Sequence, residues 1–122
     1  MSFVSPDVIS SLDLLDQRQA DTLPYGAVKI DDAGTIEVYN DYEADLAGLT
    51  TVSAIGKNWF RDIAPCTNNR LFMGRFKDGV QKGLLNTEFP YTFSYKMAIT
   101  NVKVHMVRSV QGKSNWVFVK KD

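Results

Sequence analysis

The chain contains few of the residues on which most protein chemistry depends. Its 122 residues include one cysteine, Cys66, and one histidine, His105. A single cysteine excludes an internal disulfide and any zinc site built from several cysteines. The sequence also has no glycine-rich phosphate loop, no HExxH segment and no paired metal ligands. We therefore predict no metal site and none of the common types of enzyme.

An excess of one charge and long apolar runs are missing too. Fourteen basic side chains balance fourteen acidic ones, so no net field attracts nucleic acid or an anionic membrane. No apolar stretch approaches the roughly 20 residues that span a bilayer. The first residues lack the basic and apolar regions of a secretory signal. We expect a soluble, cytoplasmic, monomeric protein with neither nucleic acid nor a membrane as partner.

Helix signals open the sequence. Ser5 is a good N-cap, Pro6 suits the first helical position, and an apolar stripe follows at helical spacing, made of Val8, Ile9, Leu12 and Leu15. A stripe this narrow, on so short a helix, needs the rest of the chain to pack against. We predict an N-terminal helical cap over residues 1–24, docked on a core of residues 25–122 within one domain.

The order of elements in that core predicts an α+β fold. Residues 23–40 have the pattern of a β-hairpin that turns at DDAG, and residues 40–65 contain short helical pieces broken by Gly or Pro. A longer helix over 71–82 and three antiparallel strands follow. Pro90 in the first of these strands indicates an edge position or a bulge. We expect an antiparallel sheet of five to six strands with helices on one face and a pocket between the two layers.

Cys66, in the segment APCT, allows several interpretations. A free cysteine most often serves as a small apolar filler of the core. A catalytic cysteine needs a base, and His105 alternates with apolar neighbours in a way that predicts a solvent-facing side chain. The surroundings of Cys66 also differ from the Asn-Cys-Arg-Phe-Leu-Gln sequence of flavin-adduct light sensors.

Tyr39 and Glu43 also have two interpretations from local pattern alone. Four residues apart at the start of a helix, they can project to a common side. However, Asn40 and Glu43 form an N-x-x-E pattern typical of a capping box, and Tyr39 suits the buried end of a strand. The local pattern favours these structural roles.

Taken together, several short stretches in register closely resemble the photoactive yellow protein family. They cover most of the chain after the first twenty-odd residues: YN..E (Tyr39, Asn40, Glu43), IGKN.F (55–60), APCT (64–67), NT.F.YTF.Y.M (86–97), VKVHM (102–106) and WVFVK (116–120). The resemblance implies a small blue-light receptor with the PAS fold. Its chromophore is p-coumaric acid (4-hydroxycinnamic acid), bound as a thioester.

Carried over by position, the resemblance makes Cys66 the attachment site and gives Tyr39 and Glu43 hydrogen bonds to the phenolate oxygen of the chromophore. It further implies that light isomerises the chromophore, that Glu43 then passes its proton to the phenolate, and that the N-terminal cap loosens to signal to an unknown downstream protein. The pocket would be lined by Ala47, Leu49, Trp59, Ile63, Ala64, Thr67, Phe93, Tyr95 and Met97, the last assisting the return to the dark state.

This light chemistry requires the phenol of the chromophore and the carboxyl group of Glu43 each to have, near pH 7, the protonation state opposite to its ordinary one. The phenol must ionise below its usual pKa of about 10, and Glu43 must stay protonated above its usual pKa of about 4.3, at about 4 kcal/mol each. A closed apolar pocket penalises a compact carboxylate more than a delocalised phenolate, which two hydrogen bonds then stabilise.

Three positions depart from the family pattern. Ala47 stands where a threonine is common, Leu49 where an arginine is common, and Trp59 where phenylalanine is usual. We expect a colour and a recovery rate that differ from those of the family. The alternative is a PAS-type small-ligand or protein-interaction sensor without photochemistry, and a cysteine enzyme is a third hypothesis.

Overall fold

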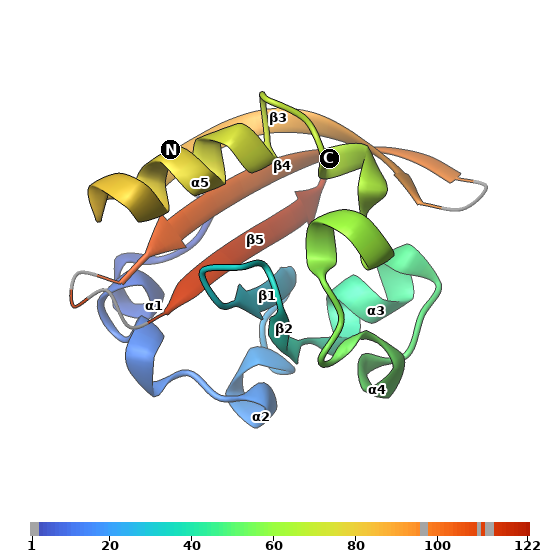
Figure 1. Ribbon diagram of the computed structural model, residues 1–122. Coiled ribbons are helices and arrows are strands. Elements are labelled where there is room, and N and C mark those ends of the chain that lie inside the picture. Colours follow the sequence, from blue (N-terminus) through green and yellow to red (C-terminus); the bar gives the residue numbers. More distant parts are fainter. Residues whose placement is uncertain (1–2, 96–97, 110, 112–113) are drawn as a thin grey trace.

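One antiparallel sheet of five strands organises the protein (Figure 1). The computed structural model describes residues 3–95, 98–109, 111 and 114–122, except for the side chains of residues 95 and 98. The strands lie in the order β2-β1-β5-β4-β3. Their bounds are β1 Gly26–Ile30, β2 Ile36–Tyr39, β3 Asn86–Tyr95, β4 Ala98–Arg108 and β5 Asn115–Lys121. The predicted hairpin and the edge position of Pro90 are confirmed, because β1 pairs with β2 and β3 closes one side of the sheet.

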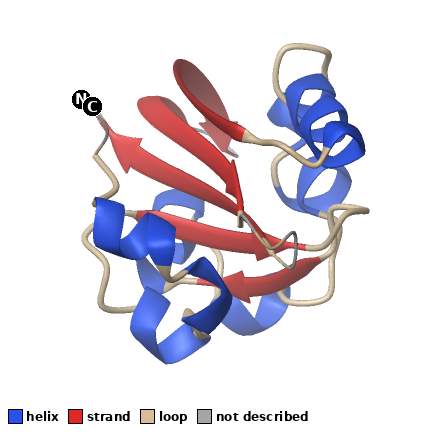
Figure 2. Cartoon of the chain, turned by 90° about the vertical axis from the view of Figure 1, so that its left-hand side faces the viewer, coloured by secondary structure: helices blue, strands red, loops and turns tan. Residues whose placement is uncertain are grey.

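The sheet separates two hydrophobic cores. Side chains alternate along each strand, so Val117 and Val119 of β5 enter one core while Trp116 and Phe118 enter the other. Helices cover both faces, as Figures 1 and 2 show. The chain is therefore an α+β domain with two unequal layers of packing around one sheet.

The larger core lies between the sheet and the middle of the chain. That segment forms α3 Asp41–Ala47, α4 Thr51–Ala54, a π-helical turn η2 Trp59–Ile63, a 3-10 turn η3 Pro65–Thr67 and α5 Met73–Lys82. Gly48 ends α3 in the left-handed conformation at φ 69°, which glycine adopts without steric cost. The helix predicted from residue 71 begins at Met73, because the Asn69 side chain accepts from Phe72 N–H at 3.0 Å and holds the preceding turn.

The N-terminal cap covers the opposite face. It consists of α1 Pro6–Ser10, the 3-10 turn η1 Leu12–Leu14 and α2 Gln17–Ala20. Ser5 Oγ accepts from Val8 N–H at 3.3 Å, as expected of an N-cap. Leu12 and Ala20 are buried against the sheet in the same core as Trp116 and Phe118. Whether residues 1–24 separate as a unit from residues 25–122 stays a prediction.

The prediction of a solvent-facing His105 is wrong. His105 is only 5 % exposed, its Nε2 lies 2.6 Å from Asn86 Oδ1, and the Phe3 ring packs at 6.5 Å between centroids. Alternation along β4 does direct His105 away from the larger core. The N-terminal segment covers that second face, so a residue on it is buried as well.

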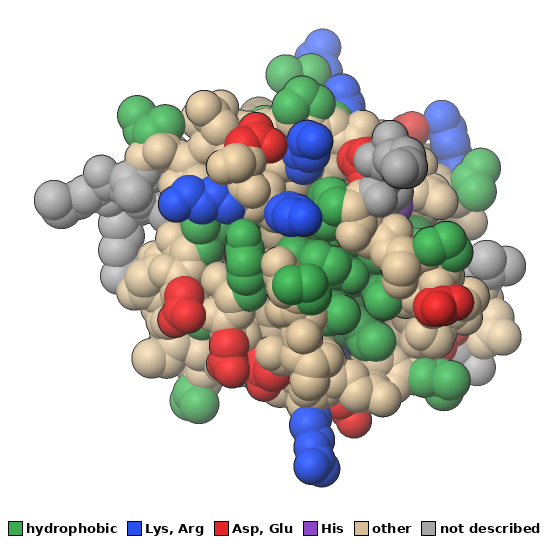
Figure 3. Space-filling model, turned by 180° about the vertical axis from the view of Figure 1, so that it is seen from behind, with side chains coloured by type: hydrophobic (Ala, Val, Ile, Leu, Met, Phe, Trp, Pro, Cys, Tyr) green, Lys and Arg blue, Asp and Glu red, His purple; other side chains and the backbone are tan. Residues whose placement is uncertain are grey.

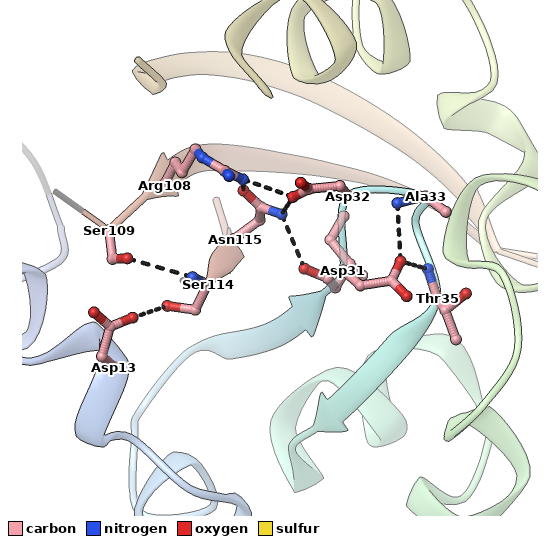
Figure 4. Close-up of polar contacts among 10 residues, drawn as sticks. Asp13, Asp31, Asp32, Ala33, Thr35, Arg108, Ser109, Ser114 and Asn115 are labelled. Atoms are coloured by element: carbon pink, nitrogen blue, oxygen red, sulfur yellow. Dashed lines mark hydrogen bonds and ion pairs between the residues drawn. The ribbon is translucent and has the colours of Figure 1, made fainter. Parts of the chain in front are cut away.

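A polar cluster joins the far end of the sheet to the cap (Figure 4). Arg108 Nη1 donates to Asp32 Oδ1 and to Asn115 Oδ1, each at 2.6 Å. On the other side of the same hairpin, Ser114 Oγ donates to Asp13 Oδ1 at 2.7 Å. The hairpin of β4 and β5 is thus tied both to the β1–β2 turn and to the cap.

Candidate functional site

Cys66 lies at the edge of a pocket of about 330 Å³ between α3 and the η2–η3 turns. Its thiol is free and half-buried. Four of the predicted site residues share this pocket, namely Ala47, Leu49, Ile63 and Cys66. The remaining lining residues are Ser53, Lys57, Asp62, Pro65 and Ser94.

The backbone of Cys66 is held in place by two side chains that the sequence analysis did not identify. Tyr91 Oη donates to the Cys66 carbonyl at 2.5 Å, and Asn69 Nδ2 donates to the same oxygen at 3.0 Å. Tyr91 alternates with Phe89 and Phe93 on the helix-facing side of β3, so that pattern was a usable signal. These bonds fix the turn from which the thiol projects.

Tyr39 and Glu43 are both completely buried. Tyr39 is the last residue of β2 and Glu43 is in the first turn of α3. Between them, Asn40 Oδ1 accepts from Glu43 N–H at 3.2 Å, which is one half of the predicted capping box. The other half is replaced, because Asn40 N–H donates to the Ala27 carbonyl at 3.1 Å. The Glu43 carboxyl group is therefore not used in capping and enters the interior.

The Glu43 side chain rests on the backbone of β1. A β-carbon built on Gly26 would lie 2.3 Å from Glu43 Oε1 and 3.2 Å from the Val119 carbonyl oxygen. Any side chain at residue 26 would occupy the space of that carboxyl group. Glycine here allows a close approach between helix and sheet.

The other predicted pocket residues occupy the same hydrophobic core. Tyr39, Ala47, Trp59, Ala64 and Phe93 belong to it, with Leu49, Ile63 and Cys66 packed against it. Thr67 is buried beside them, and its hydroxyl donates to the Ala64 carbonyl at 2.6 Å. Met97 and the side chain of Tyr95 lie outside the described residues, so their predicted roles stay predictions.

Trp59 brings a polar atom into this core. Its ring packs against Phe72 at 5.3 Å and edge-on to Phe93 at 6.2 Å between centroids. The Trp59 side chain is fully buried, and its indole N–H has no hydrogen-bond partner within the described part of the chain.

The rim of the pocket carries opposite charges. Lys57 and Asp62 both line it. The guanidinium of Arg61 donates to Asp62 at 3.1 Å and holds the pKa of that carboxyl group below its usual range. Leu49 adds an apolar side chain to the same rim.

Among the described residues, the sheet separates Cys66 from His105, the base considered for it. His105 packs with Phe3 on the cap side of the sheet, whereas Cys66 packs against the core on the other side. Burial lowers the pKa of His105 below its ordinary value of 6.5, although the nearby Glu88 carboxylate acts in the opposite direction. Within residues 3–95, 98–109, 111 and 114–122, no group of three or more metal-ligating side chains gathers.

Two comparisons with known proteins give one family, although no family model matches the chain. The photoactive yellow protein of Rhodothalassium salexigens is 45 % identical over 121 residues, which cover 99 % of this chain and 97 % of the relative. That of Halochromatium salexigens is 43 % identical over 119 residues, covering 98 % and 95 %. The chain belongs to the photoactive yellow protein family.

Solved structures agree with this assignment to the photoactive yellow protein family. The photoactive yellow protein domain of the sensor histidine kinase Ppr from Rhodospirillum centenum superposes with a TM-score of 0.85 at 37 % identity, covering 93 % of this chain and 99 % of that domain. A PAS domain of an HTR-like protein from Haloarcula marismortui has a TM-score of 0.67 at 14 % identity and shows the fold alone. The predicted PAS fold is confirmed.

Membership of the photoactive yellow protein family makes the chain a blue-light photoreceptor, as the sequence predicted. Photoreceptors of this family carry a light-absorbing chromophore. None of the helices in the described ranges is long and apolar enough to cross a bilayer.

Proposed function

We propose that Cys66 Sγ holds p-coumaric acid as a thioester and that Tyr39 and Glu43 bind its phenolate oxygen. One observation carries the proposal: the free thiol of Cys66 lines a pocket and packs against the core in which Tyr39 is completely buried. Glu43, four residues after Tyr39, is completely buried as well, and neither of these two side chains lines the pocket itself. A glutamic acid is almost never fully buried unless a specific interaction requires it.

The residues present fit such a group. The pocket of about 330 Å³ lies at the lower end of the range of small-ligand sites, about 300–1,000 Å³. Gly26 leaves room for the Glu43 carboxyl group, and the absence of a side chain there keeps that group inside the core. Trp59, Ala64 and Phe93 do not line the pocket itself but belong to the apolar core against which Cys66 packs.

Burial determines the protonation of Glu43 in this proposal. Removal from water disfavours a charged carboxylate, so Glu43 stays protonated and can donate a hydrogen bond. Tyr39 Oη is the second donor. Two donors to one delocalised anion favour the ionised phenol over the neutral one.

When bound, the group supplies absorption of blue light and isomerisation about its double bond. Glu43 would then pass its proton to the phenolate oxygen, which would leave a neutral phenol and a compact carboxylate inside the core. An unpaired buried charge is costly, so the surrounding structure relaxes to bring water to it. We propose that the N-terminal cap loosens in this step, because its helices are only three to five residues long and pack on the smaller of the two cores.

The signal leaves the chain through a downstream signalling protein in this proposal. Among the described residues, large hydrophobic side chains that are at least 66 % exposed include Leu14, Val52, Leu71, Leu84 and Ile99. Figure 3 shows hydrophobic side chains gathered in the middle of one face with charges of both signs around them. The relative from Rhodospirillum centenum is a domain of a histidine kinase. A monomeric state, a cytoplasmic location and a non-catalytic role remain part of the proposal.

An absorption spectrum tests the proposal. Purified protein is incubated with an activated ester of p-coumaric acid, and spectra are taken before and just after a blue flash. We expect a strong blue band that bleaches and returns in the wild type and is absent in Cys66→Ala. Ser94→Ala, a change in the same pocket, is expected to keep the band, and Glu43→Gln to keep attachment but shift the maximum.

Failure of attachment would contradict the proposal. So would attachment that gives only near-ultraviolet absorption without a light cycle. In either case the chain would act as a PAS-type sensor of a different small ligand or of a partner protein, without photochemistry.

A further inference from the structure

The side chain of Gln17 in the cap forms two hydrogen bonds with the backbone of Tyr39. Gln17 Oε1 accepts from Tyr39 N–H at 3.0 Å, and Gln17 Nε2 donates to the Tyr39 carbonyl at 2.8 Å. Tyr39 ends β2, which is an edge strand of the sheet. One carboxamide therefore bonds to both the donor and the acceptor that this residue presents on the open side of the strand. The Tyr39 carbonyl also accepts from Thr51 Oγ1 at 2.9 Å, whereas the Tyr39 N–H has its bond from the cap.

Neighbouring bonds extend the contact along the chain. Asp21 Oδ1 accepts from Asp41 N–H at 2.8 Å and from Gln17 Nε2 at 3.1 Å. Asn40 Nδ2 donates to the Ala20 carbonyl at 2.8 Å. The cap thus bonds to three consecutive residues, 39–41, which lead from the phenol of Tyr39 into the helix that carries Glu43.

The side chain of Tyr39 points in the opposite direction from these bonds to the cap. Its ring is fully buried in the larger core, whereas Gln17 approaches from the second face and edge of the sheet. Once the backbone is fixed, a tyrosine ring has only two torsions with which to place its hydroxyl group. A short hydrogen bond tolerates little displacement before it weakens. The backbone position of Tyr39 therefore sets the quality of any bond from its Oη.

We propose that Gln17 is a positioning residue for the chromophore site, and this rests on the proposed function of Tyr39. Gln17 holds the Tyr39 backbone so that its hydroxyl group meets the phenolate. By linkage, a ligand that needs this position also strengthens docking of the cap, and loss of the ligand contact weakens it.

A second hydrogen bond anchors the cap away from Tyr39. Removing it shows whether weaker anchoring of the cap is enough to produce the effects expected of Gln17 variants. Ser114 Oγ donates to Asp13 Oδ1 at 2.7 Å at the far end of the sheet (Figure 4). Ser114→Ala removes this bond without a change at Tyr39. Arg18→Ala alters an exposed side chain on the same helix as Gln17 and is the matched control.

The test compares proteins loaded with p-coumaric acid. The wild type, Gln17→Ala, Gln17→Glu, Ser114→Ala and Arg18→Ala are measured for absorption maximum, for the midpoint pH of phenolate formation and for recovery after a flash. A hydrogen bond to the ionised form lowers the midpoint, so its loss raises it. We expect Gln17→Ala to raise the midpoint by about half a pH unit or more, about a threefold change in the equilibrium.

The other three variants show whether the change in midpoint pH is specific to the bonds of Gln17. Gln17→Glu keeps an acceptor for Tyr39 N–H but cannot donate to the Tyr39 carbonyl as a carboxylate, so we expect a rise of the same sign. Ser114→Ala and Arg18→Ala should keep the wild-type maximum and midpoint, although Ser114→Ala should slow recovery together with Gln17→Ala. If Gln17→Ala does not fold, Gln17→Glu decides the matter.

The experiment distinguishes a failure of the proposed function from a failure of the positioning role of Gln17. If the wild type takes up no p-coumaric acid, the proposed function is wrong, and the positioning role is decided by hydrogen exchange at the Tyr39 amide in the unloaded protein. Exchange about tenfold faster in Gln17→Ala than in Arg18→Ala supports it, and equal rates overturn it. If the wild type loads but Gln17→Ala matches Ser114→Ala in maximum and midpoint, Gln17 only anchors the cap and the inference is wrong.

Discussion

Gly26 and the Glu43 carboxyl group are so close that no side-chain atom fits between them, since a β-carbon on Gly26 would lie 2.3 Å from Glu43 Oε1. We predict that Gly26→Ala displaces the Glu43 carboxyl group and destabilises the fold by about 1–3 kcal/mol, as overpacking does. In the loaded protein the absorption maximum should shift. Urea unfolding and a spectrum measure the two effects.

Gly74→Ala is the matched control for that substitution. Gly74 lies within α5, and the nearest atom to its β-carbon would be Arg70 Cγ at 3.5 Å. Because alanine is the better helix former, Gly74→Ala should stabilise the protein by about 0.5–1 kcal/mol with no spectral change. Equal effects of the two substitutions would contradict the close approach at Gly26.

Ala47 offers a test of colour. It is 3 % exposed and lines the pocket beside Cys66, where the family commonly has threonine. We predict that Ala47→Thr moves the absorption maximum of the loaded protein to shorter wavelength. A further hydroxyl donor near the phenolate stabilises the ground state, which carries more charge on that oxygen than the excited state. Ala47→Val, of the same shape, should not produce the shift, and identical spectra for both variants would show that only volume matters.

Leu49 offers a test of recovery. Leu49→Arg replaces an apolar group at the pocket rim with a cation, beside Lys57 and Asp62. We expect the recovery rate of the loaded protein to change, because a cation near the phenolate alters the stability of the dark state. Flash photolysis of Leu49→Arg and of the control Leu49→Met decides this. A rate unchanged in both would remove Leu49 from the determinants of the cycle.

Asn115 and Asp32 share one polar cluster but should contribute unequally to stability. Asn115 is 2 % exposed, its Nδ2 donates to the Ile30 carbonyl at 3.2 Å and to Asp32 at 2.8 Å, and its Oδ1 accepts from Arg108. Asn115→Ala leaves buried groups without partners, and we expect a loss of about 2–3 kcal/mol. The Asp32 side chain is 61 % exposed, so Asp32→Ala should cost about 1 kcal/mol or less. Comparable losses in urea unfolding would show that the ion pair matters more than its exposure predicts.

His105 predicts a pH dependence of stability. Its pKa in the folded protein is lowered by burial below 6.5, so the unfolded chain binds a proton more readily. Its contribution to stability is complete above about pH 6.5 and is lost as pH falls through the lower folded value. The urea midpoint of the unloaded protein should fall between about pH 7.5 and pH 5.5 more steeply in the wild type than in His105→Gln. Parallel curves would assign the dependence to other groups.

Local patterns predicted the features that depend on residues close in sequence. Ser5 caps α1 and Asn40 caps α3 as the capping patterns predicted, and β1 and β2 pair as the hairpin expected around DDAG. These outcomes depend on rules that act within a few residues.

Features that depend on distant segments were beyond those rules. The burial of His105 requires Phe3, the approach of Glu43 to Gly26 requires a helix to settle on a particular strand, and the Gln17–Tyr39 pair joins two segments 22 residues apart. Local periodicity predicts which side of a strand a residue faces but not what covers that side. The site residues themselves came from the resemblance to a family, because the local patterns around Tyr39, Glu43 and Cys66 favour ordinary structural roles.

The bond pair between Gln17 and Tyr39 also bears on how this molecule avoids other chains. An edge strand with open backbone groups is a template on which a foreign strand can pair. The carboxamide of Gln17 occupies the donor and the acceptor that Tyr39 would offer to such a strand. While the cap stays docked, that end of β2 is closed to strand addition. If the cap departs as proposed, the Tyr39 N–H becomes available to an extended peptide, while the Tyr39 carbonyl keeps its bond from Thr51 Oγ1.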